Sequence, residues 1–221
     1  EKEITHSLLS DLCGKGKKKL KFSAKEIDEL LALIDEGLHQ SQYSRQEIIN
    51  FVCKTIASKQ ARHYKYGLLA GRLHCHLIHR RLQGKRFCER LASVNVRRDL
   101  DEEVLKFAKK NWERIEFTLK YENDFNFTFF GFNTFRSLYI MKDPGTDEEL
   151  MSPQDVYMGI ALSVHKNDIN RAMKMYKNFV SAHWRKLMAG MAAGVLLTGC
   201  AMTPNGRGGV MVGLDTAELF G

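Results

Sequence analysis

The residues whose types and spacing could most readily bind a metal ion are three histidines and a cysteine that lie close together in the sequence: His74, Cys75, His76 and His79. On a helix, Cys75 and His79 would be four residues apart and His76 and His79 three apart, so either pair could share a face. A structural zinc site usually requires four protein ligands, and no second ligand cluster occurs elsewhere in the sequence. We therefore interpret these residues as ordinary helical side chains and expect no metal site.

Positive charge is concentrated in two parts of the chain, which has a net charge of +8. Residues 15–21 contain five lysines, and residues 59–98 contain eleven lysines or arginines but a single acid, Glu89. Such an excess favours anionic partners such as phosphates, nucleotides or nucleic acid. Because residues 59–98 show no aromatic interleaving and match no nucleic-acid-binding module, we interpret them as a solvated face or a face turned to nucleotide phosphates. We therefore do not expect nucleic acid as a partner.

Several other classes of protein receive no support from the sequence. It has no P-loop and no GxGxxG, HExxH or GxSxG motif. The five cysteines show no CxxC spacing, which favours free thiols in a reducing compartment, so we expect a cytoplasmic protein. The apolar residues 187–202 are fewer than the roughly 20 that a membrane-spanning helix requires, so we expect no membrane partner.

Helical signals dominate the sequence and predict a mainly α fold. Ser23 and Ser44 each begin a capping box, with glutamate three residues later, and apolar residues at helical spacing follow both. Pro153 favours a helix that begins at Ser152, because proline suits the first helical position. Apolar spacing predicts further helices at residues 68–82, 104–112 and 168–183.

One stretch departs from the helical pattern. Aromatic residues alternate with polar ones at Phe125, Phe127 and Phe129. A period of two is typical of a strand. We therefore expect strand near residues 125–132, and a second strand at residues 138–142.

Five stretches, in order along the chain, carry a resemblance to a known family. Residues 121–139 read YENDFNFTFFGFNTFRSLY and residues 151–170 read MSPQDVYMGIALSVHKNDIN. Residues 1–13, residues 63–73 (HYKYGLLAGRL) and residues 173–184 complete the set. Together they resemble the N-terminal part of class I ribonucleotide reductase large subunits. The resemblance ends at Trp184, so we assign no family role to Cys200.

The resemblance implies three parts. Residues 1–90 would be a partial ATP cone that lacks the N-terminal β-hairpin of the family. Residues 91–186 would be the N-terminal helical domain of ribonucleotide reductase, and residues 187–221 a divergent, glycine-rich apolar tail. The catalytic α/β barrel of the family would be absent from this sequence.

The resemblance also implies a function. Members of the family reduce ribonucleotides to deoxyribonucleotides for DNA synthesis, using a cysteine radical that a separate small subunit generates. This chain would be the N-terminal portion of such an oxidoreductase, with no catalytic residue of its own and inactive by itself. Its expected partners are the small subunit, further copies of the large subunit and nucleotides. The alternative is a non-catalytic basic helical binding module derived from the family.

The family further implies ATP or dATP as allosteric effectors and no cofactor in this chain. Lys2 matches a cone lysine that resembles a phosphate or adenine contact. Ser44 matches the threonine that opens the next cone helix, where it could equally be only an N-cap. Arg80 falls where the family often has a lysine, and a basic side chain there suits a triphosphate, although a solvated helix face would explain it as well. These three residues form the expected effector site.

Overall fold

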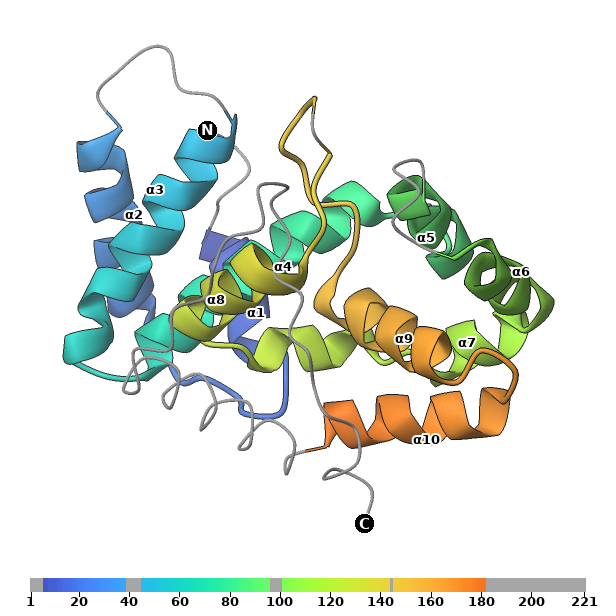
Figure 1. Ribbon diagram of the computed structural model, residues 1–221. Helices are drawn as coiled ribbons and strands as arrows, with labels where there is room; N and C mark the ends of the chain where they lie inside the picture. The colour runs from blue at the N-terminus through green and yellow to red at the C-terminus, as the bar shows by residue number, and fades with distance from the viewer. Residues whose placement is uncertain (1–5, 39–44, 96–100, 144, 182–221) are drawn as a thin grey trace, which may run out of the picture. The chain divides into compact units, whose positions relative to one another are not determined.

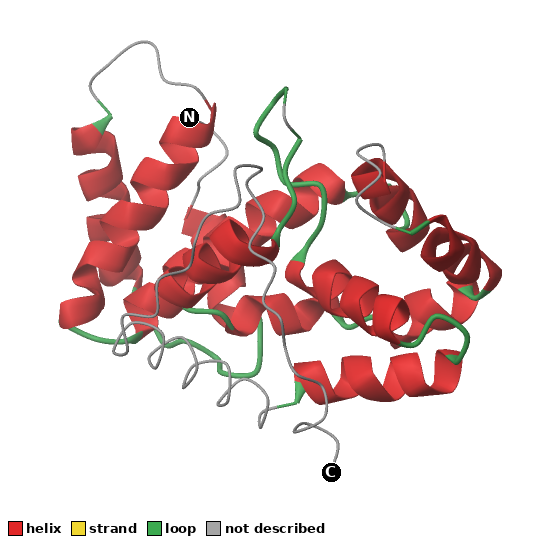
Figure 2. Ribbon diagram, viewed as in Figure 1, coloured by secondary structure: helices red, strands yellow, loops and turns green. Residues whose placement is uncertain are grey.

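The computed structural model describes residues 6–38, 45–95, 101–143 and 145–181, and nearly all regular structure within them is helical (Figure 1, Figure 2). The single β contact in these ranges is an isolated antiparallel bridge between Lys142 and Glu149. The mainly α fold class is therefore confirmed. The α-helices are α1 (His6–Gly14), α2 (Ala24–Gly37), α3 (Arg45–Ser58), α4 (Lys65–Leu82), α5 (Phe87–Asn95), α6 (Glu102–Lys110), α7 (Trp112–Thr118), α8 (Phe129–Tyr139), α9 (Pro153–Val164) and α10 (Ile169–Val180), and two 3₁₀ helices are η1 (Lys59–Ala61) and η2 (Tyr121–Asn126).

Two of the expected helix starts are confirmed by their caps. The Ser23 hydroxyl accepts a hydrogen bond from the Glu26 backbone N–H at 3.3 Å, while the Glu26 carboxylate accepts one from the Ser23 backbone N–H at 2.9 Å. Ser152 and Asp155 form the same reciprocal pair at the start of α9. Ser44, the third expected start, lies outside the described residues, and α3 begins at Arg45.

The expected strands are wrong. Residues 121–126 form η2, and the Thr128 hydroxyl then caps α8 by accepting a hydrogen bond from the Gly131 backbone N–H at 3.2 Å. The alternating aromatics serve helix packing instead, because the Phe127 ring lies 6.0 Å from the ring of Phe132 and no described segment pairs with it as a strand. Residues 138–142 include the end of α8 and contribute only the bridge at Lys142. Local β propensity is a weak guide where tertiary packing decides.

Helix α4 lies at the centre of the described core. It is buried along most of its length and packs against α1, α3, α8 and η2 (Figure 1). Gly71 allows this close packing, because a Cβ atom at this position would lie only 2.4 Å from the backbone oxygen of Phe127. Helices α9 and α10 lie side by side, and α5 and α6 both contact α9 (Figure 1).

The contacts divide the chain into two units, of which the first ends at Val180. Both residues 1–90 and the following helices up to Val180 belong to this first unit. The expected domain boundaries after residues 90 and 186 stay predictions, and the tail expected at residues 187–221 lies outside the described residues. The last predicted helix, residues 168–183, corresponds to α10.

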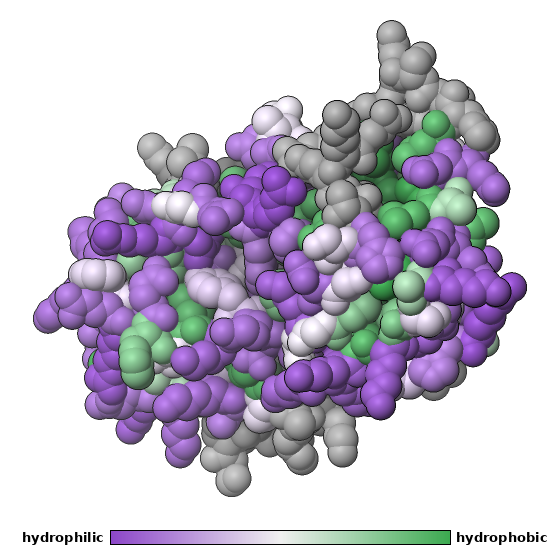
Figure 3. Space-filling view, turned by 180° about the vertical axis from the view of Figure 1, so that it is seen from behind, coloured by the Kyte–Doolittle hydropathy of each residue, from purple (hydrophilic) through white to green (hydrophobic). Residues whose placement is uncertain are grey.

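One face of the described part of the molecule is mainly hydrophilic (Figure 3). Seen from behind, hydrophilic side chains cover most of the face, and apolar ones gather in separate smaller patches (Figure 3). None of the described helices combines the length and the apolar character that crossing a membrane requires.

Candidate functional site

The structure describes one of the three expected effector residues. Lys2 and Ser44 lie outside the described residues. Arg80 lies in the last turn of α4, where its side chain is exposed. The effector site therefore stays a prediction.

The histidines and cysteine of α4 point to separate environments. His74 is buried with its ring 4.9 Å from that of Phe132, and its Nδ1 atom has no hydrogen-bond partner among the residues that the structure describes. The Cys75 thiol donates a hydrogen bond to the backbone oxygen of Asp124 at 3.2 Å, and His76 is only half-buried. Within the described ranges, no three His, Cys, Asp or Glu side chains are placed to hold one metal ion.

Electrostatics agrees with the buried setting of these groups. Burial, followed by the nearby Arg136 guanidinium, lowers the pKa of His74 to about 4, so its imidazole is neutral at pH 7. Burial, followed by the nearby carboxylate of Asp124, raises the pKa of the Cys75 thiol well above its usual range. Neither group is a ready nucleophile or base, because a pKa near 4 makes the buried His74 imidazole a weak base and the Cys75 thiol stays protonated.

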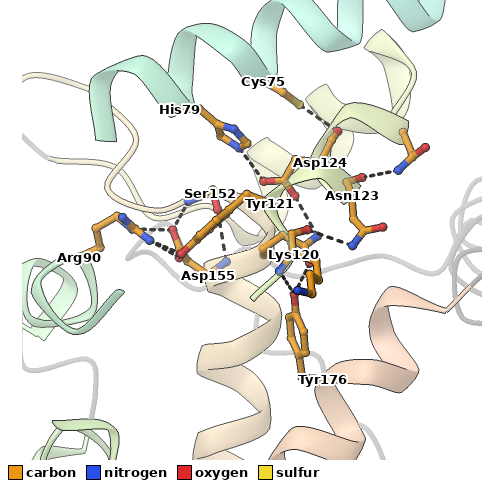
Figure 4. Close-up of polar contacts among 12 residues, drawn as sticks. Cys75, His79, Arg90, Lys120, Tyr121, Asn123, Asp124, Ser152, Asp155 and Tyr176 are labelled. Atoms are coloured by element: carbon orange, nitrogen blue, oxygen red, sulfur yellow. Dashed lines mark hydrogen bonds and ion pairs between the residues drawn. The ribbon is translucent and has the colours of Figure 1, made fainter. Parts of the chain in front are cut away.

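Asp124 is the centre of a buried polar cluster that joins four elements (Figure 4). Its Oδ2 atom lies 2.8 Å from Nε2 of His79 on α4, and its Oδ1 atom accepts a hydrogen bond from the Gln154 side chain on α9 at 2.9 Å. The Tyr176 hydroxyl on α10 donates to Gln154 Oε1 at 2.7 Å and accepts from the Lys120 backbone N–H at 3.0 Å. Burial raises the pKa of Asp124, and the contact with His79 partly offsets that rise.

A second buried carboxylate continues the cluster. Asp155 accepts two hydrogen bonds from the Arg90 guanidinium, both at 2.9 Å, and a third from the Tyr121 hydroxyl at 2.9 Å (Figure 4). The Ser152 backbone N–H donates a fourth, also at 2.9 Å. Burial alone would lower the pKa of Arg90, but the charge of Asp155 raises it above its usual value. A bidentate, fully buried pair of this kind is strong and geometrically specific.

We name this whole cluster the buried junction. It consists of His79, Arg90, Tyr121, Asp124, Gln154, Asp155 and Tyr176. Both carboxylates are fully buried, so no substrate can approach them, and each is satisfied by protein donors. The arrangement fixes helices relative to one another and offers no acid–base or nucleophilic chemistry.

The junction was missed by sequence reasoning. Asp124 and Asp155 fall inside the stretches that carry the family resemblance, but nothing in a single sequence marks a carboxylate as buried. The one available signal was the Ser152–Asp155 capping box. In it, the Asp155 side chain accepts a hydrogen bond from the Ser152 backbone N–H in addition to its ion pair with Arg90.

A small surface hollow is a further place among the described residues where a small molecule could bind. It has a volume of about 170 Å³ and is lined by Arg86, Cys88, Glu89, Lys109, Trp112 and Glu116. The Arg86 guanidinium already lies over the Trp112 ring, 4.8 Å from its centre. Burial raises the pKa of the Cys88 thiol, so it is protonated at neutral pH. The hollow is smaller than the roughly 300–1,000 Å³ of most small-molecule sites.

Comparison with known proteins identifies several large subunits of ribonucleoside-diphosphate reductase as relatives. No protein-family model matches the chain. The chain is 32% identical over 169 residues to the ribonucleoside-diphosphate reductase large chain of Encephalitozoon cuniculi. This match covers 76% of this chain and 21% of that protein. It is 28% identical over 162 residues to the large subunit from Trypanosoma brucei brucei, covering 68% of this chain and 19% of that protein. The Arabidopsis thaliana large subunit is 26% identical to this chain over 192 residues, a match that covers 83% of this chain and 21% of that subunit. The chain thus spans about a fifth of the length of the curated relatives that it matches.

Proposed function

Because this chain belongs to the family of ribonucleoside-diphosphate reductase large subunits, as an N-terminal portion of such a subunit, we propose that it serves in the reduction of ribonucleotides to deoxyribonucleotides. The observation that carries the proposal is the 169-residue match to the Encephalitozoon cuniculi enzyme at 32% identity. The relatives are all named as reductase subunits, so they do not favour the alternative of a non-catalytic basic binding module derived from the family.

The role we propose for this portion is regulatory. Its N-terminal helices bind ATP or dATP as an allosteric effector and influence how the large subunit assembles with further copies and with the radical-generating small subunit in the cytoplasm. Allosteric coupling needs two sites and a physical link between two arrangements of the protein. The buried junction supports such a link, because it ties α4 and α5 to the helices of residues 121–180 through satisfied hydrogen bonds.

The chemistry of reduction is expected outside this chain. Of the described cysteines, Cys13, Cys53 and Cys75 are buried and Cys88 is half-buried. Burial raises the pKa of all four thiols, which keeps them protonated and poorly reactive. We therefore expect that the chain alone reduces no nucleotide.

Calorimetric titration of the 221-residue chain with dATP tests the effector role. We expect weak binding, with a dissociation constant above the micromolar range, because the expected contacts are only Lys2, Ser44 and Arg80, and a charge-assisted contact is worth roughly 1.5–3 kcal/mol. Arg80→Ala should weaken it further, whereas Lys106→Ala, which removes an exposed charge from α6, should not. Submicromolar binding, or equal effects of the two substitutions, would contradict the proposed contacts.

A further inference from the structure

The loop between α1 and α2 carries an unusual set of charges. Residues 15–21, which we name the lysine loop, contain Lys15, Lys17, Lys18, Lys19 and Lys21, and all five side chains are exposed. None of them forms an ion pair with a carboxylate in the part of the chain that the structure describes. Five like charges held close together without counterions repel one another, so the folded chain gains nothing from their mutual proximity.

The core holds the backbone of this loop in place. The buried Arg72 side chain on α4 donates hydrogen bonds to the backbone oxygens of Leu12 at 2.9 Å and Cys13 at 2.8 Å, and also to that of Lys18. The Lys17 backbone N–H donates to the Asn126 side chain at 2.8 Å. The lysine charges are therefore presented from a loop whose backbone is anchored, which lowers the entropic cost of binding a ligand there.

An exposed aromatic ring lies against the same loop. Tyr64, just before α4, is 55% exposed, and the Lys18 ammonium lies 5.3 Å from the centre of its ring. The His63 ring lies 4.5 Å from the Tyr64 ring, and Arg62 beside it is also exposed. The fold thus places a partly exposed aromatic ring beside Arg62, which is close to it in the sequence, and beside Lys18, which is distant from it in the sequence.

Uncompensated cations beside an exposed aromatic ring are the chemistry that binds single-stranded nucleic acid. Lysine and arginine contact the phosphates, while a base stacks on the aromatic ring. A duplex would engage the cations but would keep its bases stacked and away from Tyr64. We propose that the lysine loop, together with Arg62 and Tyr64, binds single-stranded nucleic acid.

This proposal revises the expectation that nucleic acid is not a partner. That expectation considered residues 59–98 alone and found no known binding module. The structure adds the lysine loop to the exposed residues Arg62 and Tyr64 and so completes the combination of charge and stacking surface. The site uses none of the expected effector residues Lys2, Ser44 and Arg80 and requires no reductase activity, so it stands or falls independently of the proposed function.

Fluorescence anisotropy of the full chain with labelled oligothymidylate of about 15 nucleotides tests the site, at roughly 50 to 200 mM salt. We expect binding that weakens steeply with salt. The triple substitution Lys17→Ala, Lys19→Ala and Lys21→Ala should weaken binding tenfold or more and reduce the salt slope by about 2, at about 0.7 for each phosphate contact with a single strand. The matched control removes the same charge from α6 by Lys106→Ala, Lys109→Ala and Lys110→Ala, and should leave the salt slope nearly unchanged.

Substitution of Tyr64 separates stacking from charge. Tyr64→Ala should weaken binding about fivefold or more without changing the salt slope, and Tyr64→Phe should retain the affinity of the unmodified chain. Circular dichroism of each variant checks that the helices persist. The proposal is overturned if the chain fails to bind the oligonucleotide, if the α6 control weakens binding as much as the loop variant, or if Tyr64→Ala has no effect. It is equally overturned if blunt duplex DNA or inorganic polyphosphate competes as well as the single strand.

Discussion

The buried junction and the lysine loop differ in how their charged side chains are placed. Those of the junction are buried and paired, whereas those of the loop are exposed and have no carboxylate partner among the described residues. In the junction, the Arg90 guanidinium lies on the Asp155 carboxylate, and Asp124 contacts His79, all of them wholly or largely shielded from water. In the lysine loop, Lys17 and its neighbours are exposed and lack carboxylate partners among the described residues.

The charges of the junction stabilise the fold, whereas those of the lysine loop are available to bind an anionic ligand. Buried ions must be paired, because an unpaired one would cost several kcal/mol. Exposed lysines without partners contribute little to folding, so their placement is explained better by a ligand than by stability. Substitutions in the two regions should therefore have very different effects on the free energy of unfolding.

The largest loss of stability is expected from Arg90→Ala. It leaves the Asp155 carboxylate buried without its ion-pair partner, which costs about 3–5 kcal/mol. Urea unfolding measures this loss, with Arg86→Ala on the exposed surface as control, where a change below about 1 kcal/mol is expected. Similar losses from both substitutions would remove the distinction between the two kinds of charge.

His74, which is buried beside Phe132, should make the free energy of unfolding fall as the pH falls. Its pKa falls from 6.5 to about 4 on folding, mainly through burial, so the unfolded chain takes up a proton below pH 6.5 that the folded chain refuses. Its contribution to stability is present above pH 6.5 and declines by about 2 kcal/mol between pH 7 and pH 5. Urea unfolding of the unmodified chain and of His74→Leu at both values should show that the variant lacks this decline. Parallel pH dependence of the two proteins would contradict it.

The two capping boxes allow a smaller, matched comparison. Ser152→Ala should cost about 1–2 kcal/mol, because Ser152 is buried and water cannot replace its hydroxyl as the acceptor for the Asp155 N–H. Ser23→Ala should cost about 0.5–1 kcal/mol, because Ser23 is exposed. Thermal or urea unfolding of the two variants gives the order, and a greater loss for Ser23→Ala would refute it.

The smallest effect is expected in the lysine loop. The triple substitution of Lys17, Lys19 and Lys21 by alanine should change the free energy of unfolding by less than about 0.5 kcal/mol, because their exposed side chains form no ion pairs with described residues. The anchoring hydrogen bonds of the loop use its backbone and survive the change. A loss of 2 kcal/mol or more in urea unfolding would show that these lysines build the fold.

Local features of the fold could be predicted from the sequence, and long-range ones could not. The capping box at Ser23 and the helix start at Ser152 are encoded within four residues, and both predictions are confirmed. The aromatic alternation at residues 125–129 was misleading, because the Thr128 cap and the packing of Phe127 on α8 outweigh a period of two.

The junction and the lysine loop site depend on contacts that no local pattern reveals. Arg90 and Asp155 are 65 positions apart, and Arg72 reaches Lys18 across 54. The effector residues Lys2, Ser44 and Arg80 came from the family resemblance, and they stay predictions because only Arg80 is described.

The proposed place of this chain in ribonucleoside-diphosphate reductase is tested most directly by a chimeric enzyme. The 169 matching residues replace their counterpart in the Encephalitozoon cuniculi large chain, and conversion of labelled CDP to dCDP is measured with small subunit, thiol reductant and ATP. We expect turnover well above a blank without the chimera, a rate that differs between ATP and dATP, and a weaker effector response in the same chimera carrying Arg80→Ala. A soluble chimera with helical circular dichroism but no turnover would contradict the proposed function.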